Sequence, residues 1–267
     1  MIETVTGIMN KAAPSWGVCD FELLRSRLID CRAKARLPVN ARMVITAVFP
    51  YLLSEEHYEN SNISKYAVVS DYHTVIHGRM NKAVEELQKC FPDESFVTFT
   101  DNSPIPEVSA ALLSGLGVMG ENSLFIHERY GTYVFIGEIV TSLDIPVTGS
   151  EVKMCIHCKR CREACPTHAI GDRGPDPAKC LSAINQKKGE LTEEEKALIK
   201  KTGCAWGCDI CQTVCPMNRK AELSDIEEFI NSAVPHIESG CEIEGRAYEW
   251  RGKKVIERNL SILEEDG

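Results

Sequence analysis

The sequence lacks the features that mark several common classes of protein. It has no uninterrupted apolar run of about 18 residues, and no basic segment followed by an apolar stretch at its start, which argues against a membrane span and a secretory signal. Apart from two groups of cysteines it has no repeated unit, and it has no low-complexity tract. With 43% hydrophobic and 26% charged residues in 267 positions, the composition excludes disorder and predicts about one or two folded domains.

An excess of positive charge is also absent. The chain carries 30 basic and 39 acidic residues, which gives a formal net charge of −9. The charge as a whole therefore does not indicate nucleic-acid binding, and any such contact needs a local basic patch. Short basic clusters occur at 159–162, 187–188, 200–201, 219–220 and 251–254. If several of them share one face, they would hold RNA phosphates despite the acidic total.

Cysteine, by contrast, is abundant. The chain has 13 cysteines, an odd number, and no sign of secretion, so a disulfide framework is not expected and a reducing cytoplasm is. Nine of the 13 lie between Cys155 and Cys215. This concentration in one segment indicates that the cysteines are ligands.

The periodicity of apolar residues predicts an α+β chain. Helices are expected at 20–36, 70–89, 106–114, 177–188 and 192–201, and in the tail after Pro216. Strands are expected at 43–49, 96–99, 124–127 and 132–143. The pattern divides the chain into an α/β domain at 1–148, a cysteine-rich domain at 149–222 and a helical C-terminal tail at 223–267.

The first cysteine motif, CIHCKRCREACP, has the spacing C-x2-C-x2-C-x3-C-P. This is the bacterial ferredoxin run that holds a [4Fe–4S] cluster. Three thiolates at this spacing bind one cluster, whereas the fourth cysteine binds the other cluster in two-cluster folds. The motif consists of Cys155, Cys158, Cys161 and Cys165. It therefore requires a partner motif further along the chain.

The partner motif is CDICQTVCP, which supplies Cys208, Cys211 and Cys215. In two-cluster folds, the cysteine that precedes proline in each motif binds the cluster of the other motif. This rule assigns Cys215 to the first cluster and Cys165 to the second. The second cluster then lacks one ligand, for which Cys180 and Cys204 compete. Spacing does not separate them, because a regular ferredoxin has this cysteine at position 205, where this chain has alanine.

A zinc site is the alternative for these cysteines. Zinc binds four thiolates tetrahedrally and favours two C-x2-C pairs, whereas the triple run with a trailing C-P favours two clusters. Two clusters imply one-electron steps between a donor and a reaction centre. The remaining cysteines stand alone and are expected to be small core side chains. They are Cys19, Cys31, Cys90 and Cys241.

A GxGxxG pattern at 115–120 superficially fits a dinucleotide-binding loop. In a Rossmann fold these glycines follow a strand and begin a helix. Here a predicted helix precedes Gly115 and a predicted strand follows it. We therefore interpret the glycines as tight turns rather than as a dinucleotide site.

Four stretches carry a resemblance to a known family. They are ISKYAVVSDYH (63–73), FTDNSPIPE (99–107), GLGVMGENSLFI with YGTYVFIGEIVTSLDIP (115–146), and the cluster segment with CPTHAI, KCLSAI, GCDICQTVCPMNR and a later RNLSIL. In these stretches the chain resembles a short member of the epoxyqueuosine reductase family. The first 58 residues match weakly, and Glu121 stands where the family usually has lysine, which bears on tRNA docking.

The resemblance implies a cobalamin-binding α/β domain followed by a bacterial-ferredoxin-like domain with two [4Fe–4S] clusters. It also implies Cys180 as the last ligand of the second cluster, which leaves Cys204 as an extra cysteine. Asp101 matches the proton donor proposed for the family. Its pKa, about 3.9 in a free side chain, would have to be raised by burial beside Phe99 or a cofactor. The alternative is that Asp101 caps a helix beginning near Pro104.

The resemblance further implies contacts to the corrin ring of cobalamin. These are Ser64, Asp101, Phe125 and Ile136, with Leu181, Ser182 and Asp209 on the cluster side. Phe125 and Ile136 also have an ordinary interpretation as core residues. No D-x-H-x-x-G motif occurs, so the family implies a base-off corrinoid without a histidine ligand. His73 and His127 are accordingly interpreted as packed or exposed residues.

The function implied by the resemblance is reduction of epoxyqueuosine in tRNA to queuosine by a cytoplasmic iron–sulfur enzyme that uses cobalamin. The implied partners are the tRNA anticodon stem-loop and an external electron donor such as a flavodoxin or a ferredoxin reductase system, with no membrane. Two alternatives stay open. One is a non-catalytic electron carrier or corrinoid-handling protein, and the other is a cobalamin reductase or dehalogenase of another small substrate.

Overall fold

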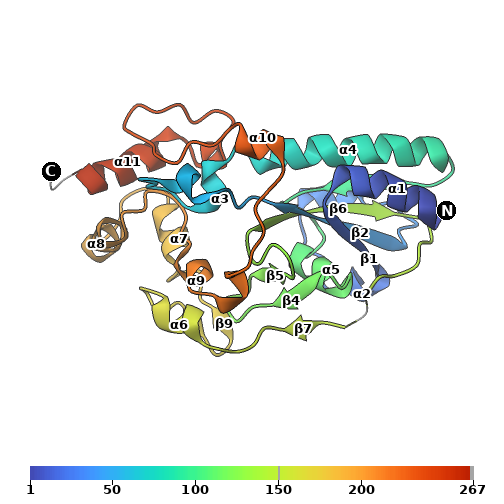
Figure 1. Cartoon of the computed structure of the whole chain (residues 1–267), viewed down its shortest axis with the longest axis horizontal. Coiled ribbons are helices and arrows are strands. Elements are labelled where there is room, and N and C mark those ends of the chain that lie inside the picture. The colour runs from blue at the N-terminus through green and yellow to red at the C-terminus, as the bar shows by residue number, and fades with distance from the viewer. Residues whose placement is uncertain (150, 265–267) are drawn as a thin grey trace. The chain divides into compact units, whose positions relative to one another are not determined.

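The computed structural model describes residues 1–149 and 151–264, which divide into two compact units (Figure 1). Unit 1 contains Met1–Pro50, Tyr72–Gly120 and the described part of Leu124–Cys155. Unit 2 contains Tyr51–Asp71, Glu121–Ser123 and the described residues from Ile156 onward. Neither unit is one continuous stretch. Residues 51–71 thus group with the cysteine-rich segment, and the described part of 223–267 belongs to unit 2 instead of forming a separate tail.

Unit 1 is built on a four-stranded antiparallel sheet with the strand order β1-β2-β6-β3. Three shorter strands form a second sheet in the order β5-β4-β7. The strands are β1 Ser15–Asp20, β2 Met43–Pro50, β3 Phe96–Phe99, β4 Gly117–Met119, β5 Phe125–His127, β6 Val134–Thr141 and β7 Lys153–Met154. The helices are α1 Ile2–Ala12, α2 Glu22–Arg25, η1 Arg32–Arg36, α4 Tyr72–Cys90 and α5 Glu107–Leu113.

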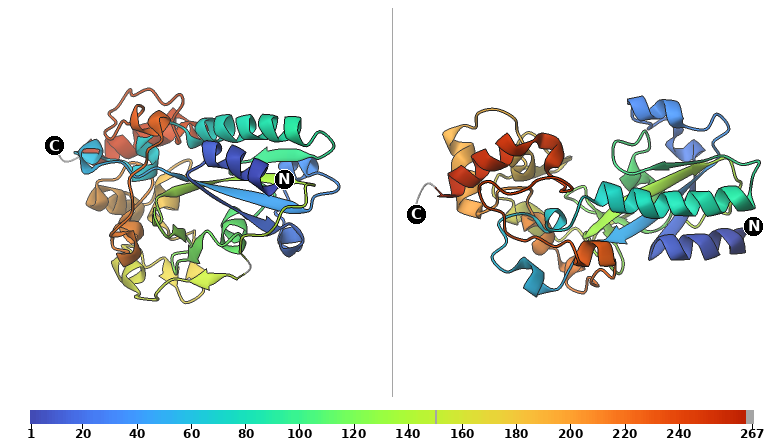
Figure 2. Two further views of the ribbon diagram at one scale, coloured as in Figure 1. Left: turned by 45° about the vertical axis from the view of Figure 1, so that its right-hand side comes forward. Right: turned by 90° about the horizontal axis from the view of Figure 1, so that it is seen from above.

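Strand β2 is buried at every position because helices cover both faces of the larger sheet. Figure 2 shows α1 and α4 lying side by side on one face, and α5 lies on the other face in Figure 1. A Cβ at Gly137 of β6 would meet Ile76 of α4, whereas Val48 packs with Ala111 of α5. The predicted buried strand at 43–49 is confirmed. The predicted layering of helices and strands is present as well, although every pairing in this sheet is antiparallel.

The expected helices at 70–89 and 106–114 are confirmed as α4 and α5, but a continuous helix at 20–36 is wrong. α2 ends at Arg25, and Ile29 is 50% exposed instead of lying on a buried face with Leu24. The Ile29 N–H donates to the carbonyl of Pro104 at 2.8 Å, a bond that a helical residue would make within its own helix. A tertiary hydrogen bond therefore overrides the amphipathic pattern.

The strands expected at 124–127 and 132–143 exist, but they belong to different sheets. Between them, His127 and Gly131 exchange backbone hydrogen bonds of 2.8 and 2.9 Å. This tight turn leads the chain from the small sheet into the large one. The glycine run behaves as predicted, because α5 precedes Gly115 and β4 begins at Gly117, an order opposite to that of a Rossmann loop.

Unit 2 consists of short helices and irregular segments around two apolar clusters. Its helices are η2 Glu55–Tyr58, α3 Lys65–Val68, α6 Arg160–Ala164, α7 Leu181–Asn185, α8 Glu193–Thr202, α9 Ile210–Thr213, η3 Pro216–Asn218, α10 Glu227–Ile230, η4 Glu249–Arg251 and α11 Lys253–Glu264. Its strands are β8 Ile170–Gly171 and β9 Gly174–Pro175. In the described part of the chain, no helix has the length and apolar character needed to cross a membrane.

Two expectations for this unit have different outcomes. The capping box is confirmed, because Thr192 and Glu195 each accept a hydrogen bond from the other's backbone N–H at the start of α8. The expected helical tail is only partly present, since 231–248 is irregular. There the amide of Asn62 makes two hydrogen bonds to the backbone of Ile237, at 2.7 and 3.0 Å, which holds the segment in a non-helical path.

Candidate functional site

Asp101 lies in a tight turn of unit 1, next to the start of helix α4. Asp101 and Asn102 have φ angles of 49° and 37°, which are uncommon for residues other than glycine. Asp101 Oδ1 accepts a hydrogen bond from the Asn102 N–H at 2.8 Å. Its Oδ2 accepts one from the Tyr72 hydroxyl at 2.9 Å and lies 3.4 Å from Nε2 of His73. The first two residues of α4 therefore hold this carboxylate in place.

These contacts set the ionisation of Asp101. The hydrogen bond with His73, assisted by those from Asn102 and Tyr72, lowers the pKa of Asp101 to about 2 although partial burial opposes the shift. The acid role predicted for Asp101 needed a raised pKa, whereas the structure stabilises the carboxylate. The capping alternative is also wrong, because Pro106 occupies the N-cap of α5 and no side chain caps that helix.

Two glutamates lie near this aspartate. Glu138 on β6 is 1% exposed and accepts a hydrogen bond from the Ser103 hydroxyl at 2.7 Å through Oε2. Its Oε1 is buried without a hydrogen-bond partner among the described residues, and burial raises the pKa of Glu138 well above its usual value. Glu107 stands in the first turn of α5, where burial and the charge of Asp101 raise its pKa to about 7.

A cavity of about 470 Å³ opens beside this turn in unit 1. Its lining residues are Ile29, Cys31, Asp101, Asn102, Ser103, Ile105, Pro106, Glu107, Val108 and Ser109. The cavity therefore contains both an ionised carboxylate, that of Asp101, and a carboxyl group whose charge changes near neutral pH, that of Glu107. Such a pair is suited to accepting and delivering a proton.

Sequence reasoning missed three residues of this site, namely Tyr72, His73 and Glu107. His73 was expected to be merely packed or exposed, but it contacts Asp101. The signal was present, because SDYH and FTDNSPIPE contain all three residues. His127 does behave as a packed residue, since it is 5% exposed and its Nε2 lies 3.0 Å from the Ser15 hydroxyl.

The predicted cluster cysteines are free thiols and lie mostly in unit 2. Cys155 is the last residue of unit 1, where its N–H donates to the carbonyl of Met119 at 2.9 Å. In unit 2 the thiol of Cys211 interacts electrostatically with three other thiols, those of Cys180, Cys161 and Cys165. The fold of unit 2 therefore brings together cysteines that are up to about fifty positions apart in the sequence.

Cys180 and Cys204 have different surroundings. Cys204 Sγ donates to the carbonyls of Trp206 and Gly207 at 3.2 and 3.4 Å, and burial raises the pKa of this thiol to about 12. Burial raises the pKa of Cys208 and Cys211 in the same way, so the two hydrogen bonds to carbonyls, and not the pKa, distinguish Cys204. Cys180 is the N-cap residue of α7 and interacts with Cys211. These contacts favour Cys180 over Cys204 as the eighth ligand.

The thiol groups fit clusters better than a single metal ion. Burial raises the pKa of Cys165, but hydrogen bonds from Thr167, Ala169 and Ile170 outweigh it and lower the pKa below its usual value. Within residues 1–149 and 151–264, no three Cys, His, Asp or Glu side chains converge closely enough to hold one ion.

The residues predicted to contact a corrin divide between the units, and each has a defined place in its own unit. In unit 1, Phe125 and Ile136 are 4% and 6% exposed in one apolar cluster, which is the ordinary core arrangement. In unit 2, Leu181 is buried in α7, and the Ser182 hydroxyl accepts a hydrogen bond from the side chain of Gln186 at 3.1 Å.

Ser64 and Asp209 form a closer pair within unit 2. Asp209 Oδ2 accepts a hydrogen bond of 2.6 Å from the N–H of Lys65, and burial raises the pKa of Asp209 to about 6. The Ser64 hydroxyl is buried without a hydrogen-bond partner among the described residues. Because buried hydroxyls are nearly always partnered, Ser64 is suited to bind a group that the polypeptide itself does not provide.

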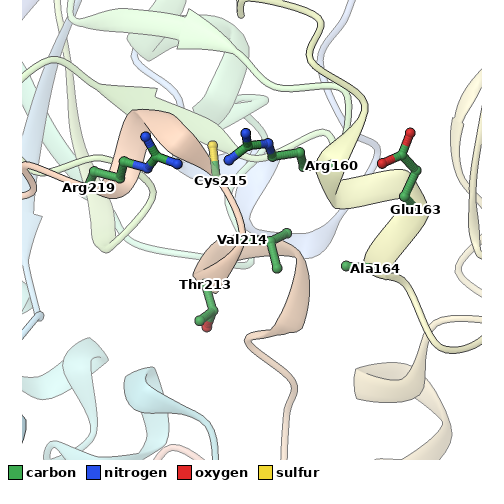
Figure 3. A pocket seen from close by; sticks show the side chains of 7 residues that line it. All are labelled: Arg160, Glu163, Ala164, Thr213, Val214, Cys215 and Arg219. Carbon is green, nitrogen blue, oxygen red and sulfur yellow. The ribbon is translucent and has the colours of Figure 1, made fainter.

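A second cavity, of about 550 Å³, lies beside Cys215 in unit 2. It is lined by Arg160, Glu163, Ala164, Thr213, Val214, Cys215 and Arg219. Figure 3 shows the sulfur of Cys215 between the guanidinium groups of Arg160 and Arg219. Neither arginine forms an ion pair with the described residues, whereas Arg162 is paired with Asp172. Two of the five basic clusters therefore meet beside a predicted cluster ligand.

Glu121, which replaces the usual lysine of the family, lies in unit 2. Its Oε1 is 3.1 Å from Nδ1 of His157, next to Cys158 in the first motif. Glu121 thus has His157 as a defined partner. A lysine at this position would instead repel the protonated form of His157.

Two family models match separate parts of the chain. The model of the 4Fe-4S double cluster binding domain matches residues 154–218, and the model described as Epoxyqueuosine reductase QueG, DUF1730 matches residues 32–102. The first range contains all of the predicted cluster cysteines. Residues 154–218 are therefore a double [4Fe–4S] cluster binding domain.

Relatives and solved structures extend this similarity. An epoxyqueuosine reductase from Lactococcus garvieae is 30% identical over an alignment of 277 positions. The alignment covers 90% of this chain and 78% of the relative. One from Listeria monocytogenes is 31% identical, covering 72% of this chain and 54% of its own length. An epoxyqueuosine reductase solved with a tRNA-Tyr epoxyqueuosine-modified stem loop has a TM-score of 0.80 at 23% identity, covering 98% of this chain and 80% of that chain.

A reductive dehalogenase described with a mechanism for B12-dependent dehalogenation shares the fold more distantly. Its TM-score is 0.51 at 15% identity, covering 94% of this chain and 34% of the dehalogenase. The Lactococcus relative, by contrast, matches over both the cluster domain and the Asp101 turn. The chain belongs to the epoxyqueuosine reductase family.

Proposed function

We propose that the chain reduces epoxyqueuosine in tRNA to queuosine. The observation that carries the proposal is the similarity over 90% of the chain to an epoxyqueuosine reductase, which includes the cluster domain and the Asp101 turn. The reaction consumes two electrons and two protons. Both carbon–oxygen bonds of the epoxide break, a carbon–carbon double bond forms, and the oxygen leaves as water.

Electrons pass singly through the two [4Fe–4S] clusters. The first cluster has Cys155, Cys158, Cys161 and Cys215 as ligands, and the second has Cys165, Cys180, Cys208 and Cys211. The hydrogen bonds of Cys204 to two carbonyls support its exclusion from this set. The hydrogen bond from Ala169 N–H to the sulfur of Cys165, 3.4 Å long, supports a thiolate at that position.

An external donor delivers these electrons at the cavity beside Cys215. Arg160 and Arg219 offer two positive charges there that have no ion-pair partner in the described structure, which suits an acidic redox protein such as a flavodoxin. The sulfur of Cys215 lies between them, so a partner bound at the arginines would be next to a ligand of the first cluster.

Cobalamin, when bound, supplies a strongly reducing centre that carries the electrons to the substrate. The Ser64 hydroxyl, which has no partner in the described structure, and the buried carboxyl of Asp209 support a role in binding it. Leu181 and Ser182 are further contacts from unit 2, and Asp101, Phe125 and Ile136 are contacts from unit 1. Phe125 and Ile136 serve mainly as apolar packing.

Asp101 gives a proton to the oxygen that leaves the epoxide. Tyr72 and His73 hold its carboxylate, and the positive φ angles of Asp101 and Asn102 turn this loop sharply. Because these contacts stabilise the ionised form, Asp101 has to receive a proton before it can deliver one.

The relative solved with a modified tRNA stem loop supports tRNA as the partner that carries the substrate. All five basic clusters of the sequence lie in unit 2, and each is a candidate for contact with backbone phosphates. The proposed setting is the cytoplasm, where both tRNA and reduced thiols are found.

The test starts with the chain purified without oxygen and supplied with iron, sulfide, cobalamin and dithionite as the source of electrons. Incubation with tRNA from cells that lack the reductase, followed by mass spectrometry of the nucleosides, should show epoxyqueuosine replaced by queuosine. A change in corrin absorption with unchanged epoxyqueuosine would redirect the assignment to another small substrate. Absence of any corrin change would contradict the enzyme and favour a two-cluster electron carrier.

A further inference from the structure

The proposed reaction needs more protons than Asp101 can hold. Each turnover takes up two protons, whereas one carboxyl group carries one, and the structure keeps Asp101 ionised. A neighbouring group that holds a proton near neutral pH would load Asp101 before each proton transfer. If the proposed function holds, unit 1 contains a group in the right place for this role.

Glu107 has the required position. It lines the same cavity as Asp101, on the first turn of α5, while Asp101 belongs to the loop that leads into this helix. Glu107 is partly buried, and the charge of Asp101 acts on it across this cavity. No hydrogen bond to another side chain fixes its carboxyl group, and it is not in an ion pair within the described residues.

We propose that Glu107 is the proton store of this site and loads Asp101. The O–H bond of the neutral Glu107 carboxyl breaks, water in the shared cavity passes the proton on, and the proton binds a carboxylate oxygen of Asp101. Asp101 then gives the proton to the oxygen of the substrate. The Glu107 carboxylate regains a proton from water in the cavity, and the cycle runs twice for each epoxide reduced. The two electrons come from the clusters, so protons and electrons balance the water that leaves.

The charged and titratable groups around Glu107 support this role. Asp101 raises the pKa of Glu107 and His73 lowers it, while burial is the largest effect, so the pKa of about 7 lets Glu107 gain and lose a proton near neutral pH. The other titratable groups at this site are Tyr72, Cys31, Cys19 and Glu138. Glu138 is buried, uses one oxygen for Ser103 and has no place in the cavity wall.

Glu107 acts through Asp101, so its test needs a signal that a merely structural role would not change. Infrared spectroscopy of the complete reconstituted chain detects protonated carboxyl groups without any turnover. Asp209 gives a carboxyl band that disappears around pH 6 in every variant, so the titrations are compared in an Asp209→Asn background. There a band that disappears around pH 7 is expected with Glu107 intact and in Glu3→Gln, and is expected to be missing in Glu107→Gln. Glu3 is the matched control, because it stands exposed in the first turn of α1. Persistence of the band in Glu107→Gln would overturn the proposal.

Turnover against pH gives the second measurement. In the wild type kcat should fall as pH rises through about 7, because Glu107 loses its proton. Glu107→Gln should lower kcat roughly 100-fold with little change in KM and without that pH dependence, and Glu107→Asp should recover part of the rate. A Glu107→Gln enzyme with the wild-type rate and pH profile would also overturn the proposal. If the wild type does not reduce epoxyqueuosine at all, the proposed function fails, and the infrared titration still decides whether Glu107 is a proton store.

Discussion

The two units of the molecule differ in the kind of backbone that carries their reactive side chains. Unit 1 has a sheet covered by helices on both faces, and its reactive carboxyl groups stand at the ends of regular elements. Unit 2 places its thiols on helices of four or five residues and on the loops between them, such as α6, α7 and α9. Isolated helices of this length are not stable in water, so unit 2 relies on other forces.

The difference indicates what each unit needs in order to fold. Unit 1 has enough apolar burial to fold around its own core, because β2 and the facing side of α4 are fully covered. In unit 2 the iron–sulfur bonds contribute folding free energy, as metal ligation does in other small domains with little regular structure. The carboxyl chemistry of unit 1 is therefore expected to survive changes that unfold unit 2.

The largest expected effect is removal of the clusters. Chelation of iron should leave the backbone amides of β2 protected from hydrogen exchange, while those of α6, α7 and α9 lose most of their protection. The measurement is hydrogen exchange followed by mass spectrometry on the holo and apo chains. Equal loss of protection in both units would contradict the comparison.

The same comparison can be made with one cysteine at a time. Cys180→Ser should lower the iron content to about half, because it removes one ligand of the second cluster. Cys204→Ser is the matched control and should keep the full iron content, since its thiol is occupied by two carbonyl groups. Iron analysis of both variants checks this, and the reverse result would move Cys204 into the ligand set.

The next effect in size concerns Asp101 in unit 1. Asp101→Asn should reduce turnover by about 10²- to 10⁴-fold, because an amide cannot pass on a proton. Iron content and corrin absorption should stay unchanged, since the cluster ligands lie elsewhere and the new side chain has the same shape. Kinetics with spectroscopy on the same sample checks both statements. Full activity would remove Asp101 from the proton pathway.

A smaller effect is expected on stability against pH. Burial raises the pKa of Glu107 from 4.5 to about 7, so the native state binds more protons than the unfolded state between these values. Its contribution is therefore fully present below pH 4.5 and is lost as pH rises to about 7, at up to about 1.4 kcal/mol per pH unit and about 3 kcal/mol in total.

Denaturant unfolding of unit 1 at several pH values measures this contribution. Glu107→Gln should flatten the dependence relative to the wild type, whereas Glu3→Gln should not. A wild-type stability that rises over this interval, with no change in Glu107→Gln, would show that Glu107 is ionised in the native state.

The smallest effect is expected at the basic cavity of unit 2. A double change, Arg160→Glu with Arg219→Glu, should slow reduction by a flavodoxin roughly 10-fold at low salt and less at high salt, because the attraction is electrostatic. Reduction by dithionite should be unaffected. Lys188→Glu, an exposed position in another basic cluster, is the control. An equal slowing by Lys188→Glu would point to net charge instead of a docking surface.

The sequence predicted the larger sheet and the cluster motif well because both depend on local patterns. The buried strand at 43–49 is an apolar run, and the cysteine motif is a fixed spacing that one cluster requires. The helix expected at 20–36 failed because the N–H of Ile29 bonds to Pro104, a partner that no local pattern reveals.

The pKa values of the carboxyl groups at this site could not be predicted from local sequence patterns either. A pKa depends on neighbours from distant parts of the chain, and Asp101 meets Tyr72 and His73 only after α4 and β3 have packed. The acid role proposed for Asp101 needs a raised pKa, whereas the neighbours that the fold brings to this side chain lower it. The motif FTDNSPIPE also contains Glu107, but nothing in the sequence indicates that burial raises the pKa of Glu107 above that of Asp101.

In the proposed reaction, two electrons from the clusters convert one epoxyqueuosine into one queuosine. The most direct measurement adds a known amount of reductant to the reconstituted chain with modified tRNA, and counts the queuosine formed by mass spectrometry. One queuosine should form for each two electrons consumed, and Asp101→Asn should form it at least about 10²-fold more slowly. Consumption of electrons without formation of queuosine would contradict the proposed reaction.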